Sequence, residues 1–226
     1  MSTVLPTAPL AGVPTIGPTM ADLQHQLGDI PPQRILMRPP PGMATEEDLL
    51  EAMDRKGAIH ELIDGTLVEK AMGYFESHLA AVLIHILSDF ISKNDLGILL
   101  AEQGTLRILP DQIRAADVAF LSWDRFSNRR LPRAKVPNLA PDLAVEVLSE
   151  GNTEAEMARK RREYFNAGVG LVWIIDPESQ TARIFTALDE ATEIDREGIL
   201  SGGNVLPGFE LKLGDLFDRA GQRESE

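Results

Sequence analysis

The sequence contains no cysteine. This absence excludes a disulfide scaffold, a zinc site built from thiolates and a cysteine nucleophile. Long apolar runs are also missing: the longest lies around Ala80 to Leu87, whereas a membrane-spanning helix needs about 18 or more apolar residues in succession. The first residues lack the basic start and apolar core of a secretory signal. We therefore expect a soluble, cytoplasmic protein without a membrane partner.

Several common functional motifs are absent as well. The chain has no P-loop, no glycine fingerprint of a dinucleotide-binding fold, no GxSxG nucleophile elbow and no internal repeat. It therefore gives no support for those classes of nucleotide-binding protein or serine hydrolase. With 226 residues, the chain is long enough for one domain with a substantial core and short appendages.

Basic charge is scarce, since the net charge is −13. This argues against a nucleic-acid partner, because a polyanion normally binds a basic surface. The basic residues are unevenly distributed, however: Arg125, Arg129, Arg130, Arg133 and Lys135 share one segment with no acid between them. Two interpretations stay open, a solvated loop or a DNA-contacting surface formed by Arg129, Arg130 and Arg133.

Proline is concentrated at one end of the chain. Nine of the fifteen prolines lie in the first 41 residues, so residues 1–43 are expected to form an irregular extension with a short helical turn near residues 20–27. A folded domain is expected over residues 44–217, followed by a polar tail over residues 218–226.

One acidic residue interrupts a strongly apolar strand pattern. Residues 142–148 alternate between two nearly apolar faces, which predicts an interior strand covered on both sides. One face carries Leu143, Val145 and Val147, and the other carries Ala144, Glu146 and Leu148. A carboxylate removed from water is costly unless it is paired, hydrogen-bonded or bound to a metal. Glu146 is therefore a candidate functional residue.

A helix is predicted after this strand, because Thr153 and Glu156 have the spacing of a capping box. Its sheet-facing side, by the spacing of three and four residues, carries Met157, Lys160 and Tyr164. Lys160 is therefore expected to point toward the strand that holds Glu146. A simple buried ion pair between these two residues is one interpretation, and a functional site requires a third member.

Residues 116–121 supply that third member. They form a second short apolar strand pattern with one acid, Asp117, on the face of Ala119 and Leu121. Two neighbouring strands that each present an inward carboxylate, with a lysine from the following helix, provide the groups of a hard-cation site able to polarise a phosphodiester.

At these positions the chain resembles a known family. The phrases that carry the resemblance are DVAF from Asp117, PDLAVEVLS from Pro141, KRREYFNAGV from Lys160, WIIDP from Trp173 and HELIDGTLVEK from His60. They are similar to the Uma-two-type restriction endonucleases of the PD-(D/E)XK superfamily, over about Ala44 to Phe217. The resemblance implies an α/β fold with a central mixed sheet flanked by helices. It also implies an N-terminal hairpin, which Asp64-Gly65 independently predicts.

The resemblance also implies a metal site. Asp117 and Glu146 are expected to hold Mg²⁺, for which Mn²⁺ can substitute, with the Val147 carbonyl as a further ligand. Lys160 is expected to orient the attacking water, although the lysine of the usual superfamily motif falls on Leu148 here. The proline that usually precedes the first acid is also replaced, by Ala116.

Two more residues enter through the resemblance alone. Glu61 in the hairpin is expected to bind a second cation or to act on water, assisted by His78 at the start of the following helix. The expected activity is a magnesium-dependent DNA endonuclease, with DNA as partner and a homodimer left open. A non-catalytic nucleic-acid or protein-binding module on the same fold, supported by the acidic net charge, is one alternative. A hydrolase of a small phosphorylated substrate is the other.

Overall fold

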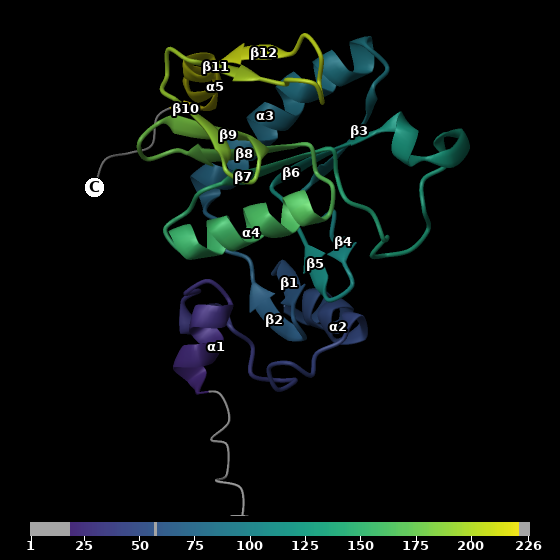
Figure 1. Cartoon of the computed structure of the whole chain (residues 1–226), viewed down its shortest axis with the longest axis vertical. Coiled ribbons are helices and arrows are strands. Elements are labelled where there is room, and N and C mark those ends of the chain that lie inside the picture. Colours follow the sequence, from purple (N-terminus) through teal and green to yellow (C-terminus); the bar gives the residue numbers. More distant parts are fainter. Residues whose placement is uncertain (1–18, 57, 222–226) are drawn as a thin grey trace, which may run out of the picture.

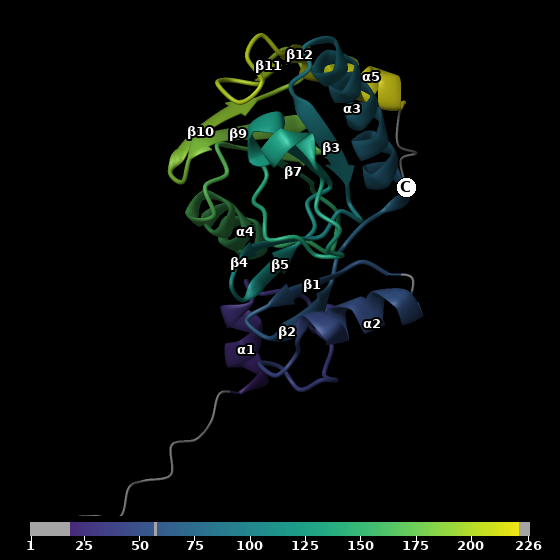
Figure 2. The same cartoon turned by 90° about the vertical axis from the view of Figure 1, so that its right-hand side faces the viewer.

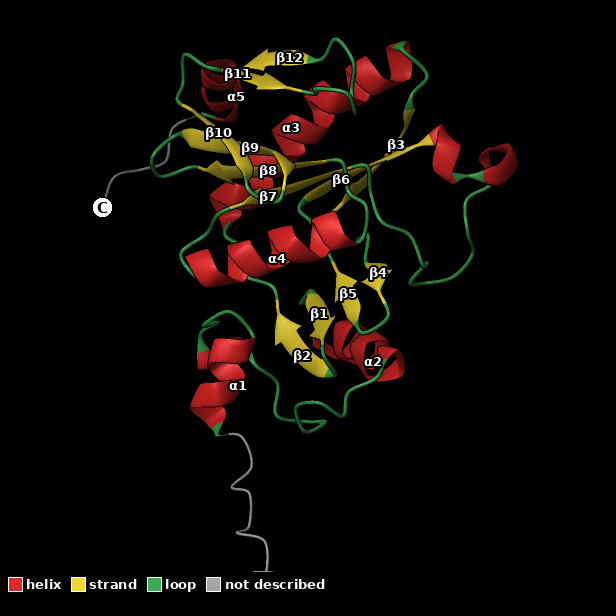
Figure 3. Cartoon of the chain, in the orientation of Figure 1, coloured by secondary structure: helices red, strands yellow, loops and turns green. Residues whose placement is uncertain are grey.

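A six-stranded mixed sheet forms the centre of the molecule (Figures 1 and 3). The computed structural model describes residues 19–56 and 58–221. The strands follow the order β10-β9-β8-β7-β6-β3, and their bounds are Gly97–Ala101 (β3), Val118–Ser122 (β6), Leu143–Val147 (β7), Leu171–Asp176 (β8), Thr181–Ala187 (β9) and Glu190–Ile194 (β10). β7 and β8 are parallel, because α4 (Glu154–Asn166) crosses over between them. The predicted central mixed sheet is confirmed.

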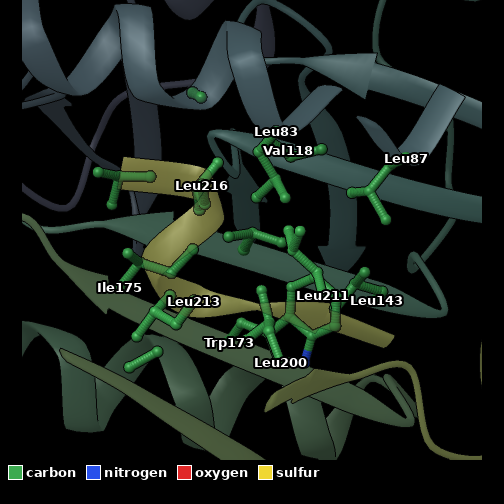
Figure 4. Close-up of a cluster of buried hydrophobic side chains, with 14 of the residues drawn as sticks. Leu83, Leu87, Val118, Leu143, Trp173, Ile175, Leu200, Leu211, Leu213 and Leu216 are labelled. Carbon is green, nitrogen blue, oxygen red and sulfur yellow. The ribbon is translucent and has the colours of Figure 1, made fainter. Parts of the chain in front are cut away.

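Different helices cover the two faces of this sheet. α3 (Tyr74–Lys93), α5 (Leu213–Ala220) and the hairpin of β11 (Ile199–Ser201) and β12 (Glu210–Lys212) lie on one face, and α4 lies on the other (Figures 1 and 2). Figure 4 shows the larger core, where Leu83 of α3, Leu143 of β7 and Leu216 of α5 lie in one apolar cluster.

The alternation predicted for residues 142–148 is confirmed. Leu143, Val145 and Val147 of β7 belong to the core beneath α3 and α5. Ala144 belongs to a second core that also contains Met157 and Tyr164 of α4. Glu146 lies on the Ala144 face of the strand, because side chains two residues apart point the same way. This face is the one covered by α4.

A smaller antiparallel sheet lies beyond α4, with the order β2-β1-β5-β4. Its strands are His60–Ile63 (β1), Thr66–Glu69 (β2), Leu106–Leu109 (β4) and Gln112–Arg114 (β5), and α2 (Glu46–Lys56) packs on it through Leu49. The predicted hairpin is confirmed, since Asp64 and Gly65 both have positive φ, 47° and 68°, as a two-residue hairpin turn requires. β5 leads through residues 115–117 into β6, so the two sheets meet at Asp117.

The segment of residues 19–42, expected to belong to an irregular extension outside the domain, packs on the hairpin of the smaller sheet. This segment contains α1 (Met20–Gln26), where the short helical turn was predicted, and the 3-10 turn η1 (Pro32–Arg34). Leu27, Ile30 and Ile35 are buried in one cluster with Ile63 and Val68 of the hairpin. Proline content indicated a lack of regular structure, but these apolar side chains gain enough buried surface to attach the segment to the domain.

One charged residue fixes the same segment to α4. The guanidinium of Arg34 is buried and donates to both carboxylate oxygens of Glu156, at 2.8 and 2.9 Å. It also donates to the carbonyl oxygens of Glu69, at 2.8 Å, and Gly151, at 2.6 Å. Residues 19–42 are thus part of the folded domain, and residues 1–18 lie outside the described part of the chain. At the other end, α5 continues through Ala220 into the predicted polar tail.

Among the described residues, α3 is the one helix whose length and composition would suffice to cross a membrane. Length and composition are weak evidence, because the core helix of a water-exposed protein passes the same test. In α3, Leu79, Leu83, Leu87 and Ile91 are buried against the central sheet, which is the pattern of a core helix.

Candidate functional site

A cluster of buried charged side chains lies where the two sheets and α4 meet, with β1 and β5 on the side of α4 away from β9 and β10 (Figures 1 and 2). Each of its members keeps less than a tenth of its surface exposed. The smaller sheet and its flanking loops contribute Glu61, Lys70 and Arg114, the junction between the sheets contributes Asp117, β7 contributes Glu146, and α4 contributes Lys160, Glu163 and Tyr164.

Glu146 receives two hydrogen bonds from α4. Lys160 Nζ lies 3.0 Å from Glu146 Oε2, and the hydroxyl of Tyr164 donates to Glu146 Oε1 at 2.6 Å. Burial raises the pKa of Glu146; the charges of Lys160 and Lys70 oppose this, and the charge of Asp117 adds to it. Burial and the neighbouring charge of Glu146 also raise the pKa of Tyr164 well above its usual value, so its hydroxyl remains a donor. The predicted approach of Lys160 to Glu146 is confirmed.

Asp117 is held beside β7 by the backbone. Its amide donates to the Val145 carbonyl at 3.0 Å, and its Oδ2 accepts a hydrogen bond from the Val147 amide at 2.6 Å. Its Oδ1 is buried, lies 2.8 Å from Lys70 Nζ and has no hydrogen bond of proper geometry. The carboxylate thus has one oxygen occupied by the backbone and one facing a cation, which is the disposition of an available metal ligand.

Lys70 is one of the residues of this cluster that sequence reasoning missed. It directly follows β2, and its ammonium lies 2.8 Å from Asp117 and 3.9 Å from Glu146 while donating to the Ala115 carbonyl. The pairing of the two hairpin strands could have indicated the position of Lys70. Glu61 pairs with Val68, and Lys70 is two residues farther along the strand, so Glu61 and Lys70 share one face of the hairpin.

Glu61 is the second carboxylate that Lys160 contacts. Lys160 Nζ is 3.3 Å from Glu61 Oε1, Arg114 donates to Glu61 Oε2 at 2.8 Å, and the Ala115 amide donates to Oε1 at 3.1 Å. Burial alone would raise the pKa of Glu61, but the charges of Lys160, Arg114 and Lys70 outweigh it and hold the pKa well below its usual range. Glu61 is therefore an ionised residue that holds Lys160 in place.

The cluster continues through Arg114 to Glu163 of α4. Arg114 Nε donates to Glu163 Oε2 at 2.7 Å, so Arg114 joins Glu61 and Glu163 across the gap between the smaller sheet and α4. Burial opposes the charge of Arg114, but Glu163 and Glu61 raise its pKa above the usual value. Sequence reasoning did not single out Arg114, because one arginine in a three-residue strand produces no periodic pattern.

His78 does not lie with these residues. It is exposed on α3, and no hydrogen bond or ion pair found among the described residues joins it to the cluster. The helix face that turns inward near this end carries Glu76 and Leu79. The expectation that His78 assists Glu61 is thus not supported by the arrangement, because the start of α3 presents position 78 to solvent.

The carboxylates of the cluster provide some of the ligands that a divalent cation needs. In the described part of the chain, no three His, Asp or Glu side chains converge as metal ligands. Mg²⁺ is nevertheless commonly held by one or two carboxylates together with waters and substrate oxygens. Asp117 and Glu146 provide two such carboxylates, and Asp117 Oδ1 lacks a proper hydrogen bond. The residues fit such a cation, provided that the ammonium of Lys70 leaves the space that it occupies between them.

The basic segment is only partly available to a ligand. Arg129 makes two hydrogen bonds to Asp95, at 2.9 and 2.7 Å, and stacks on Trp123. Arg130 and Arg133 are exposed, and no ion pair found among the described residues involves them. Of the three arginines singled out from the sequence, two therefore keep an uncompensated charge.

This segment lies on the same face of the sheet as the cluster. Lys135 and Leu131 border a hollow of about 200 Å³ with Leu121 of β6, and Leu121 belongs to the core on the α4 side. Leu121 is four residues beyond Asp117 on one strand, a separation of about 13 Å at about 3.3 Å per residue. Leu131 and Lys135 of the basic segment therefore lie on the face of the central sheet that α4 covers.

A mixed sheet between helices, with acids from two adjacent strands and a lysine from the next helix, defines a restriction-endonuclease-like α/β protein. The chain belongs to the Uma2 family, described as "Putative restriction endonuclease", whose model matches residues 46–214. It is similar to a crystal structure described as "a putative nuclease belonging to DUF820" from Anabaena variabilis, with a TM-score of 0.68 and 19% identity over 78% of this chain and 98% of that chain. At that identity, the likeness shows a shared fold. No curated protein matches the chain.

Proposed function

We propose that this protein is a magnesium-dependent endonuclease that hydrolyses phosphodiester bonds of DNA. The observation that carries the proposal is the meeting of Asp117 and Glu146, from adjacent strands, at Lys70 and Lys160 in one buried cluster. Family membership and the fold support a nuclease. The metal, the substrate and the residue roles are inferred from the chemistry of the side chains.

Asp117 and Glu146 would hold Mg²⁺ or Mn²⁺, with the Val147 carbonyl as a further ligand. The bound cation would polarise the scissile phosphate and lower the pKa of a water. The Val147 peptide supports this arrangement because its amide already fixes Asp117 Oδ2. Tyr164 fixes Glu146 Oε1 in the same way, so each carboxylate has one oxygen oriented by the protein and a second that faces a cation.

Lys160 is the proposed catalytic cation. Its ammonium lies between Glu146 and Glu61, at 3.0 and 3.3 Å, and is buried. These two carboxylates raise the pKa of Lys160 even though burial opposes its charge, so it acts as a fixed positive charge and donor. Such a group can orient the attacking water and offset the negative charge that develops on the phosphate. Glu61 acts as a positioning residue for Lys160.

DNA is the proposed substrate in spite of the acidic net charge. Arg130 and Arg133 carry exposed positive charges in the segment whose Lys135 borders the hollow beside Leu121. Contacts of exposed arginines to phosphates supply affinity that does not depend on sequence. The ion pairs within the buried cluster would also suit a non-catalytic DNA-binding module, in which the cluster has only a structural role. Metal-dependent cleavage distinguishes the endonuclease from such a module.

The test measures cleavage and metal binding together. Supercoiled, linear and single-stranded DNA are incubated with Mg²⁺, Mn²⁺ or EDTA, and Mn²⁺ binding is measured by calorimetry. Asp117→Asn and Glu146→Gln are expected to reduce cleavage by about two or more orders of magnitude and to weaken Mn²⁺ binding. Glu154→Gln, on the exposed start of α4, is the control and is expected to match the wild type. Cleavage that persists in EDTA, or DNA binding without any cleavage, would overturn the proposal.

A further inference from the structure

The buried cluster is nearly balanced in charge by the protein's own groups. Among the described residues, its carboxylates are Glu61, Asp117, Glu146 and Glu163, and its cations are Lys70, Arg114 and Lys160. These acids and bases contact one another at 2.6 to 3.9 Å. A divalent cation added to this set would leave an excess of positive charge in a region away from water, which is unfavourable, whereas a divalent cation that replaced one of the bases would balance the acids.

One of the three cations occupies the position that a metal would need. Lys70 is the base whose ammonium contacts both Asp117 and Glu146, at 2.8 and 3.9 Å. Lys160 contacts Glu146 but lies toward Glu61, and Arg114 lies between Glu61 and Glu163. Lys70 therefore provides, from the protein, the positive charge that the two carboxylates require.

Lys70 is also the cation that can leave most readily. Arg114 is in β5 and Lys160 is in α4, whereas Lys70 lies in the connection of residues 70–73 between β2 and α3, which has no regular structure. A lysine carries its charge on a flexible stem of four carbons. Its ammonium can move away by rotation within the side chain, without displacement of a strand or helix.

We propose that Lys70 is a resident counter-ion of the site, which a divalent cation displaces when it binds to Asp117 and Glu146. The inference rests on the proposed function, because it takes these two carboxylates as the metal ligands. Metal binding is then an exchange of cations. The protein without metal keeps both acids in contact with Lys70, and the apparent metal affinity is lowered by the fraction of molecules in which Lys70 occupies the position.

The first test is the binding of Mn²⁺ alone, measured by electron paramagnetic resonance. Lys70→Met keeps the apolar stem and removes the competing charge, so it is expected to bind Mn²⁺ about tenfold or more tightly than the wild type. Lys93→Met is the matched control, since Lys93 is exposed on α3 and pairs only with the exposed Asp89 among the described residues. It is expected to bind Mn²⁺ as the wild type does.

The second test uses the wild type and does not depend on the folding of a variant. Lysine side chains are acylated for short times with and without Mn²⁺, and the modified positions are quantified by mass spectrometry. Lys70 is buried while it contacts Asp117, so its displacement is expected to increase its rate of acylation. The rate at exposed Lys93 is expected to stay the same.

The outcomes separate this inference from the proposed function. If Mn²⁺ binds to the wild type and is lost in Asp117→Asn, while Lys70→Met binds no tighter or Lys70 acylation does not change, the counter-ion role is overturned and the metal site stands. If Lys70→Met does not fold, the acylation result alone decides. If neither the wild type nor Lys70→Met binds Mn²⁺ through Asp117 and Glu146, both the exchange and the metal dependence fail.

Discussion

Replacement of Lys160 by methionine tests whether the centre of the buried cluster has a catalytic or only a structural role. Methionine keeps much of the apolar stem, which packs on the same helix face as Met157 and Tyr164, and deletes the ammonium. Glu146 and Glu61 then lose a cation at 3.0 and 3.3 Å. The perturbation is thus confined to one charge with two buried partners.

The loss of stability depends on the contacts that Glu61 and Glu146 retain. Removing one member of a buried ion pair costs about 3–5 kcal/mol of the free energy of unfolding. Glu61 retains Arg114 and the Ala115 amide, and Glu146 retains Tyr164 and the more distant Lys70, so we expect the lower end, about 3 kcal/mol. At a typical dependence of about 2–3 kcal/mol per molar urea, the midpoint falls by about 1 M or slightly more, and the protein remains folded in water.

The catalytic cost is measured on the folded variant. We expect Lys160→Met to reduce DNA cleavage by about two or more orders of magnitude, the effect of losing one electrostatic or acid-base group. Arg162→Met is the control, because Arg162 is exposed on the same helix; it should change stability by no more than about 0.5 kcal/mol and retain activity. Urea titrations give the first quantity and initial cleavage rates the second. Wild-type cleavage by a destabilised Lys160→Met would leave Lys160 with only a structural role, and unchanged stability would contradict the ion-pair geometry.

Arg34→Leu should lower the free energy of unfolding by about 3–5 kcal/mol, measured by urea denaturation, because it leaves Glu156 buried without its guanidinium; Arg55→Leu, which breaks an exposed pair, should cost no more than about 0.5 kcal/mol. Burial would raise the pKa of Glu156, but its hydrogen bond to Arg34 lowers it below the ordinary 4.5, so its stabilisation is complete above that pH and lost as the pH falls through the folded value. The difference between wild type and Arg34→Leu should therefore shrink below pH 4.5, and a constant difference would contradict the ion pair. The double variant Arg130→Ala, Arg133→Ala should reduce the salt dependence of DNA binding by about two units of slope, and an unchanged slope would favour a solvated loop.

Local patterns in the sequence were sufficient to predict the strand, the helix and the hairpin that carry Glu146, Lys160 and Glu61. The alternation of residues 142–148 placed Glu146 on the face opposite Val145 and Val147, and the helical spacing placed Lys160 on the face toward it; both are confirmed. Asp64-Gly65 fixed the hairpin that carries Glu61. These features depend on periods of two and 3.6 residues and on the φ preferences of a turn, which neighbouring residues alone determine.

The Thr153 cap shows where local reasoning ends. Its side chain accepts a hydrogen bond from the Glu156 amide at 3.0 Å, as the predicted helix start requires. The carboxylate of Glu156, expected to complete the capping box, instead binds Arg34, 122 residues away. A buried guanidinium that satisfies both carboxylate oxygens is a stronger partner than one backbone amide, and no pattern within the helix indicates its presence.

The composition of the cluster was likewise decided by the tertiary structure. The sequence determined that Glu146, Asp117 and Lys160 stand in apolar surroundings, and hence that they need partners. It did not determine that Lys70 contacts Asp117 and Glu146 or that Arg114 joins Glu61 to Glu163, because that depends on how the smaller sheet packs against α4 and the central sheet. Lys70 and Asp117 are 47 residues apart, and their contact at 2.8 Å exists only because β5 passes directly into β6 at the junction of the two sheets. Burial creates the need for a counter-charge locally, and only the packing of distant segments selects the residue that meets it.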